Sequence, residues 1–194
     1  YLNIIFRSFQ LSFGATLLCL IFGFPVAYYI TLQPENRRNF YIYLVTIPFW
    51  TNLLIRTFAW IIILGRGGVI EAPLLATGII DDSLRMMYSD GAIAIGLTYS
   101  YLPLMVLPIY ASLEKLDFRL LDAASDLYAN RFEIMTKVVI PLSKPGIIAG
   151  CILVFIPCLG AFIAPNLLGG GKKLMLGSLV QFQFASARNW PFGG

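Results

Sequence analysis

Long uncharged runs of apolar residues alternate with short polar segments along the chain. Residues 8–34, 91–113 and 145–171 contain no charged side chain, and these runs hold 27, 23 and 27 residues. A helix crosses the apolar core of a bilayer with about 20 apolar residues, so each run is long enough to span a membrane. The pattern therefore predicts an all-α protein that is embedded in a membrane, with its backbone hydrogen bonds satisfied inside helices.

Four transmembrane helices can be drawn from this pattern. We expect them at residues 8–32, 40–64, 91–113 and 145–168. Residues 114–144 form the only long polar stretch between them. The expected architecture is a polytopic transmembrane helical bundle, with residues 1–194 forming a single membrane-spanning domain.

The composition supports this prediction and excludes several kinds of chemistry. Hydrophobic residues make up 58% of the 194 positions and charged residues 12%, with a mean hydropathy of +0.78. The chain has no histidine, which excludes a Ser–His nucleophile pair, a histidine-bound zinc ion and an imidazole proton relay. Cys19, Cys151 and Cys158 fall in the uncharged runs, where they resemble buried apolar residues rather than a disulfide or metal set. We expect no catalytic residue, no metal site and no cofactor in this chain.

Two signals that could indicate nucleic-acid or nucleotide binding are weak. The net charge is +4, but the basic residues are scattered among apolar runs and form no stripe. The sequence Gly169-Gly170-Gly171-Lys172-Lys173 lacks the Gly-x4-Gly-Lys-Ser/Thr spacing of a phosphate loop. We therefore expect neither a nucleic-acid partner nor a nucleotide site in this chain.

The polar stretch 114–144 has the pattern of two short amphipathic helices joined by a turn. Asp117 is placed to cap the first helix, and Pro141 is expected to end the second. Apolar residues recur at helical spacing along one face of the first helix: Leu120, Leu121, Ala124, Leu127 and Tyr128. Such a pair is too short and too charged to span, so we expect it to lie at the membrane surface and to face a partner in water. The periodicity alone favours an ordinary amphipathic connector.

The same residues resemble a known motif. Asp122-Ala123-Ala124, then Ala129 and then Val139-Ile140-Pro141 resemble the EAA motif of binding-protein-dependent ABC import permeases, whose pattern is Glu-Ala-Ala, three residues, Gly and a later hydrophobic-Pro. Five further segments resemble the spermidine/putrescine branch of that family: residues 48–57 (PFWTNLLIRT), 113–117 (LEKLD), 145–150 (PGIIAG), 166–170 (NLLGG) and 189–193 (NWPFG). The last of these resembles the first of the two permease subunits in the branch.

This resemblance implies a MetI-like fold of the ABC type I importer permeases and a site that binds an ATPase. Family members have six spans, so one span before Tyr1 and one after Gly194 are expected to be absent here. The stretch 114–144 would be the coupling element that docks in a groove of a cytoplasmic ATPase. The residues that the motif assigns to it are Asp122, Ala123, Ala124, Leu127, Tyr128, Ala129, Asn130 and Pro141.

The resemblance also implies location, orientation and partners. It implies a multi-pass protein of the bacterial inner membrane, in contact with lipid, in which residues 33–39 face the cytoplasm and residues 65–90 face outward. The implied partners are a second homologous permease, two ATPase subunits that carry ATP and Mg, and an external or periplasmic substrate-binding protein. The implied solute is a polyamine, spermidine or putrescine. A permease of this architecture for a metal chelate or oxyanion is the first alternative, and a secondary carrier or channel is the second.

Two residues depart from the family motif. Asp122 stands where the family has Glu, and it remains an anion near a helix start. Tyr128 stands where the family has Gly, which is harder to explain, because a tyrosine is strained at positive φ. Either the turn is shifted toward Ala129 and Asn130, or coupling in this chain is altered. Tyr128 also lies on the apolar face, which suggests that it anchors the segment in the ATPase groove.

Arg56 is the one charged residue inside a predicted span. A charge at such depth indicates a functional site by default, and with Trp50 and Asn52 it is a candidate for the solute path or for support between helices. Because a polyamine is a polycation, a bare arginine in its path would repel it. We therefore favour a supporting role, with a carbonyl or a carboxylate of the partner subunit as the expected mate.

Overall fold

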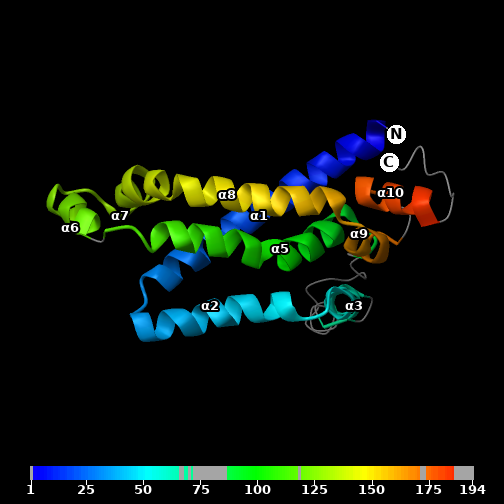
Figure 1. The fold of residues 1–194 in the computed structure, drawn as a ribbon, viewed down its shortest axis with the longest axis horizontal. Coiled ribbons are helices and arrows are strands. Elements are labelled where there is room, and N and C mark those ends of the chain that lie inside the picture. Colours follow the sequence, from blue (N-terminus) through cyan, green and yellow to red (C-terminus); the bar gives the residue numbers. More distant parts are fainter. Residues whose placement is uncertain are drawn as a thin grey trace. The chain divides into compact units, whose positions relative to one another are not determined.

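The computed structural model describes residues 2–65, 68–69, 71, 87–117, 119–170 and 174–185, and the regular secondary structure in this part of the chain is entirely helical (Figure 1). Its helices are α1 (Leu2–Thr31), α2 (Glu35–Trp50), α3 (Leu53–Leu64), α5 (Asp90–Leu113), α6 (Arg119–Asp126), α7 (Arg131–Ile134), the π-helix η1 (Met135–Val139), α8 (Ile140–Gly160), α9 (Ile163–Leu168) and α10 (Leu176–Ala185). The closing motif at 189–193, the lysines of the 169–173 sequence and most of the expected outward loop 65–90 lie outside the described residues.

Among the residues that the structure describes, three continuous helices are long and apolar enough to cross a membrane. They are Leu2–Thr31, Asp90–Leu113 and Arg131–Gly160, and α2 with α3 supplies a fourth span if the broken pair counts as one. Three to four spans agree with the predicted all-helical bundle. Helix α1 begins earlier than the predicted start at residue 8, and α5 matches the predicted span 91–113 closely.

The second predicted span is not continuous. The expectation of one helix over 40–64 is wrong, because α2 ends at Trp50 and α3 begins at Leu53. Asn52 has ψ of 131°, which is not helical, and its side-chain oxygen accepts the N–H of Leu54 at 2.8 Å. A side chain that satisfies a free donor at a helix start favours a new helix over continuation of the old one.

The fourth predicted span is also interrupted. The expected helix over 145–168 begins earlier, at Ile140 or before, ends at Gly160, and is followed by the separate helix α9. Pro165 lies in the first turn of α9, where its missing N–H would have no helical partner in any case. Proline is therefore accommodated by starting a new helix just before it.

Two compact units make up the chain, and several helices contribute to both. One unit contains residues 18–48 and 101–154, and its core is formed by α1, α5, η1 and α8 residues with exposed fractions near zero: Ala27, Ile30, Met105, Val106, Ile109, Leu113, Val139 and Val154. In this unit α8 runs along α5 (Figure 1). A Cβ on Gly146 would lie 2.5 Å from the backbone oxygen of Pro108, so glycine is what allows the two backbones to approach so closely.

The other unit contains residues 1–17, 49–100 and 155–194. Arg7 of α1 forms an ion pair with Asp90 at the start of α5. The Ser8 hydroxyl accepts the N–H of Leu176 at 2.8 Å and so ties α1 to the first residue of α10. These polar contacts join three chain segments that are distant in sequence.

Apolar side chains also cover much of the outer surface of the long helices. Those exposed by more than half on α1 and α8 include Phe13, Ile21, Phe22, Ile148, Ile152 and Ile156. In water a surface of this kind would drive association. In a bilayer the same side chains are solvated by lipid, which fits the predicted membrane location.

Candidate functional site

The candidate coupling segment, residues 114–144, begins with a short helix whose start is capped by a preceding side chain of the same segment. Helix α6 spans Arg119–Asp126, and the Asp117 carboxylate accepts the N–H of Arg119 at 3.0 Å. The predicted capping role of Asp117 is therefore confirmed. Asp122 lies in the first turn of α6 and is exposed, so its negative charge meets the positive end of the helix dipole.

A left-handed turn at Tyr128 ends this first helix. Tyr128 has φ of +60°, the N–H of Tyr128 bonds to the Ser125 oxygen at 3.0 Å, and the N–H of Ala129 bonds to the Ala124 oxygen at 3.1 Å. Helices commonly stop in this way, with one left-handed residue that is usually glycine. The chain therefore adopts the conformation that the family glycine would favour, with a tyrosine in its place.

The alternative of a shifted turn is wrong. Asn130 has φ of −76° and ψ of 166°, which is extended backbone. Its side chain instead accepts the N–H of Glu133 at 2.8 Å, while the Glu133 carboxylate accepts the N–H of Asn130 at 3.1 Å. This reciprocal capping box starts helix α7 and leaves Tyr128 as the left-handed residue of the turn.

Lys137 reinforces the start of α7. Its Nζ lies 2.9 Å from Glu133 Oε1, one helical turn away. The Glu133 carboxylate therefore receives hydrogen bonds from both the Lys137 ammonium and the Asn130 N–H, which hold it at the start of the helix.

Pro141 does not end the second helix, contrary to the prediction. Residues Arg131–Gly160 form one continuous helix of 30 residues, which includes a π-helical turn at Met135–Val139. In that turn the N–H of Ile140 bonds to the Met135 oxygen, five residues back. The wider turn accommodates the ring and the missing N–H of Pro141, so the helix passes from the polar segment into the span without a break.

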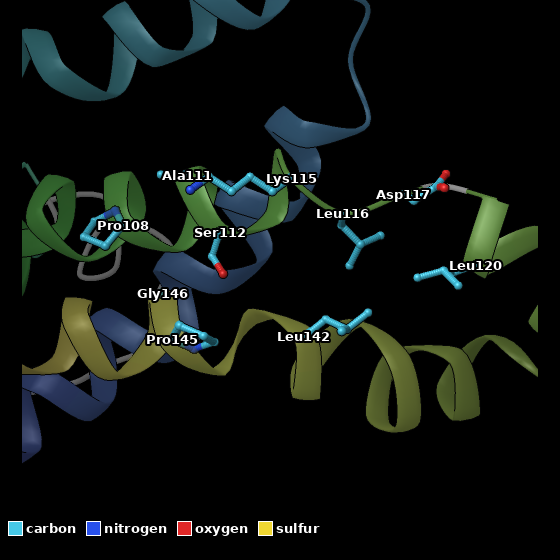
Figure 2. A pocket seen from close by; sticks show the side chains of 10 residues that line it. All are labelled: Pro108, Ala111, Ser112, Lys115, Leu116, Asp117, Leu120, Leu142, Pro145 and Gly146. Atoms are coloured by element: carbon cyan, nitrogen blue, oxygen red, sulfur yellow. The ribbon is translucent and has the colours of Figure 1, made fainter.

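The single apolar face expected on the first short helix is divided in two. Leu127, Tyr128 and Phe132 are exposed by 81%, 96% and 76%, and they form an apolar tip around the turn. Leu120 points the other way, toward Leu116 and Leu142, as Figure 2 shows. Ala123 is exposed, whereas Ala124 and Ala129 are half-buried. The tip is therefore the most exposed apolar part of the segment.

A cavity of about 670 Å³ separates the start of the candidate coupling segment from α5 and α8 (Figure 2). Its apolar wall comes from the end of α5, from Leu120 and from the start of α8, with Lys115 and Asp117 at its edge. All of its lining residues belong to the unit of residues 18–48 and 101–154. Residues 115–117, which follow α5, are thus not packed tightly against the spans.

Arg56 lies in a different environment, in the unit that contains α3. Arg56 is 9% exposed, and its guanidinium carbon lies 5.9 Å from the centre of the Tyr99 ring. Tyr99 in turn meets Trp60 edge to face at 5.5 Å. A guanidinium over a tyrosine is attractive, and it links α3 to α5. The Tyr99 ring was not foreseen from the sequence, where only oxygen mates were considered for Arg56.

Trp50 and Asn52 do not share the surroundings of Arg56. Trp50 is 84% exposed at the end of α2, and Asn52 is an exposed helix cap. Of the three candidates, only Arg56 is buried. A structural role of Asn52 at the helix break is thus directly visible, while a solute path through the three residues remains a prediction.

We expect Arg56→Ala to lower the yield of folded protein. Loss of the contact with Tyr99 removes roughly 0.5–2 kcal/mol from the association of α3 with α5. The measurement is the folded fraction after solubilisation, by size-exclusion chromatography. Arg56→Lys is the matched control, because it keeps the cation and should lose less. Unchanged yield together with altered solute preference would contradict the supporting role and make Arg56 a path residue.

Comparison with known proteins gives consistent similarities. Residues 17–190 match the family described as binding-protein-dependent transport system inner membrane component. The chain is 42% identical over 193 residues to the spermidine/putrescine transport system permease protein PotB of Salmonella typhimurium (strain SL1344), covering 100% of this chain and 67% of that protein. PotB of Escherichia coli (strain K12) is also 42% identical over 193 residues, with 100% and 70% covered.

A more distant relative and a solved structure extend this similarity. The inner membrane ABC transporter permease protein YdcU of Escherichia coli (strain K12) is 31% identical over 204 residues, covering 97% of this chain and 64% of that protein. A chain of the bacterial alginate ABC transporter, crystallised in complex with an alginate pentasaccharide-bound periplasmic protein, superposes with a TM-score of 0.66 at 15% identity, covering 97% of this chain and 70% of that one. The shared fold confirms the all-helical importer-permease architecture.

Proposed function

Because the chain belongs to the family of binding-protein-dependent transport system inner membrane components, we propose that it is the permease subunit of an ATP-driven importer of polyamines such as spermidine and putrescine. As an inner-membrane permease, it would provide part of the solute path. The similarity to PotB over 100% of the chain supports the choice of polyamines.

The observation that carries the coupling role is the geometry of the turn at Tyr128. A short helix, a left-handed residue and a second helix follow one another at the spacing of the family motif. The exposed apolar tip of Leu127, Tyr128 and Phe132 is suited to an apolar groove on another protein. We propose that this groove belongs to a cytoplasmic ATPase, with Asp122, Ala123, Ala124, Ala129 and Asn130 shaping the docking segment and Pro141 the helix behind it.

The chain's own contribution would be mechanical rather than chemical. ATP and Mg would be bound and hydrolysed by two ATPase subunits, and a second homologous permease and an external binding protein would complete the complex. The continuous helix Arg131–Gly160 supports this division, since it joins the docking segment to a membrane span without a break. Movement of the tip by the ATPase would therefore be delivered directly to α8, and the spans would alternate between inward-open and outward-open states.

The test is uptake by the reconstituted complex of both permeases, the ATPase and the binding protein. Radiolabelled spermidine is offered outside proteoliposomes that contain ATP, and the expected result is accumulation that requires both ATP and the binding protein. A complex with an ATPase unable to hydrolyse ATP is the control. ATP-dependent uptake of a metal chelate or an oxyanion without polyamine uptake would contradict the assignment of polyamines as the solute. Uptake without ATP would contradict the assignment as an ATP-driven importer.

A further inference from the structure

Arg38 makes contacts that no part of the proposed function uses. It lies in the first turn of α2, and its Nε and Nη2 donate to the backbone oxygens of Gln33 at 3.2 Å and Thr31 at 3.1 Å. Its Nη1 lies 3.8 Å from Glu114 Oε1, and the Tyr110 hydroxyl donates to the same oxygen at 2.8 Å. All five residues belong to the unit of residues 18–48 and 101–154.

Two helix ends meet at this arginine. Helix α1 ends at Thr31, and α5 ends at Leu113, directly before Glu114. Each C-terminal end carries carbonyl groups without helical partners and a partial negative charge. Glu114 adds a full negative charge, which is unfavourable at a helix C-terminus on its own. The guanidinium of Arg38 binds the last carbonyl of α1, at Thr31, and lies beside the Glu114 carboxylate, so its planar fork reaches acceptors from both chain segments at once.

The burial of the partners makes this arrangement well defined. Thr31 is 2% exposed and Tyr110 8%, while the Arg38 and Glu114 side chains are exposed by 21% and 50%. The arginine is therefore held against fixed helix ends, and Glu114 is held by both Arg38 and Tyr110. An ion pair fixed in this way is more restrained than one between two freely exposed side chains.

We propose that Arg38 is a positioning residue that fastens the turn between α1 and α2 to Glu114, the first residue of the candidate coupling segment. Beyond Glu114 the chain borders the cavity shown in Figure 2, so Lys115 and Leu116 are not packed tightly. Glu114 would act as a fixed point, and movement of the segment would reach α1 and α2 as well as α5 and α8. This inference deepens the proposed function and rests on it.

The chain provides a matched control at the next position. Arg37 is exposed, and its side chain makes no hydrogen bond or ion pair within the described residues. Arg37→Ala removes the same charge from the same helical turn without touching Glu114. Arg38→Lys keeps the charge but cannot serve three acceptors in this geometry, so it should fall between Arg38→Ala and the unchanged protein.

The first measurement is structural and does not depend on the solute. Spin labels are attached at Asn36→Cys and Lys115→Cys in the full complex, in a background without the three native cysteines, and their distance distribution is measured by pulsed EPR. Both positions are exposed. The distribution should be broader with Arg38→Ala than in the otherwise unchanged protein or with Arg37→Ala. An unchanged distribution with Arg38→Ala would overturn the fastening.

The second measurement is the amount of solute imported per ATP hydrolysed. We expect this ratio to fall about two- to fivefold with Arg38→Ala, the size expected for loss of an ion pair whose carboxylate is half exposed, while the ATPase stays bound. Glu114→Gln should lower the same ratio, and Arg37→Ala should leave it unchanged. A broadened label distance with an unchanged ratio would overturn the role in coupling. If the unchanged complex imports no polyamine, the proposed function fails, and the EPR comparison still decides whether Arg38 fastens the turn.

Discussion

Replacing Tyr128 with glycine is expected to change two properties in opposite directions. The left-handed backbone at φ of +60° costs a tyrosine about 1 kcal/mol or more, and glycine removes that cost. Since the side chain is 96% exposed, its loss sacrifices little packing within the chain itself. The free energy of unfolding should rise by roughly 1 kcal/mol, as measured by denaturant titration of the purified permease.

The same substitution should weaken retention of the ATPase by about tenfold or more, because a large exposed aromatic at a docking tip has the character of an interface hot spot. Copurification of the ATPase with the permease measures this. Tyr128→Asn is the matched control, since asparagine tolerates left-handed backbone but lacks the ring. It should share the loss of ATPase and show a smaller gain in stability. Undiminished retention with both variants would rule out the anchoring role of Tyr128.

Adding a single methyl group at Gly146 is expected to be strongly destabilising. A Cβ there would lie 2.5 Å from the Pro108 backbone oxygen and 2.6 Å from the Ser112 Cβ, so α5 and α8 must move apart. Overpacking of this kind costs about 1–3 kcal/mol. Gly146→Ala should therefore lower the midpoint of thermal unfolding in detergent, and Gly146→Leu should lower it further or prevent folding.

Gly160 provides the control in the same helix. A Cβ at this position has no atom within 4 Å, so Gly160→Ala meets open space. Because alanine is a better helix former than glycine by up to about 1 kcal/mol, this substitution should be neutral or stabilising. Equal effects of alanine at the two positions would contradict close packing at Gly146.

The long uncharged runs were sufficient to predict the spans, but not where they break. Charge spacing located the helix Asp90–Leu113 almost to the residue. It could not reveal the break at Asn52, because a helix cap depends on one side-chain hydrogen bond that periodicity does not register. It also misjudged Pro141, since a π-helical turn can carry a proline through a helix that would otherwise end.

The candidate site was predictable in its position and less so in its conformation. The EAA-like motif located the turn, and a family glycine at position 128 implied positive φ, which the chain adopts. The split of the apolar face could not be seen from periodicity, because Leu120 lines the same cavity as Leu142, which is 22 positions further along the chain. Arg38 drew no attention for a similar reason: its partner Glu114 lies 76 positions further along the chain, and no local pattern connects the two.

The exposure of Ser125 to a membrane-impermeant thiol reagent is the measurement that most directly tests the central claim, that residues 114–144 face the cytoplasm and bind an ATPase there. Ser125 is exposed on α6, close to the tip, so Ser125→Cys should be reactive without disturbing the fold. We expect labelling in inverted vesicles and not in intact cells, and slower labelling when the ATPase is bound. Labelling of intact cells from outside would contradict the orientation and with it the coupling role.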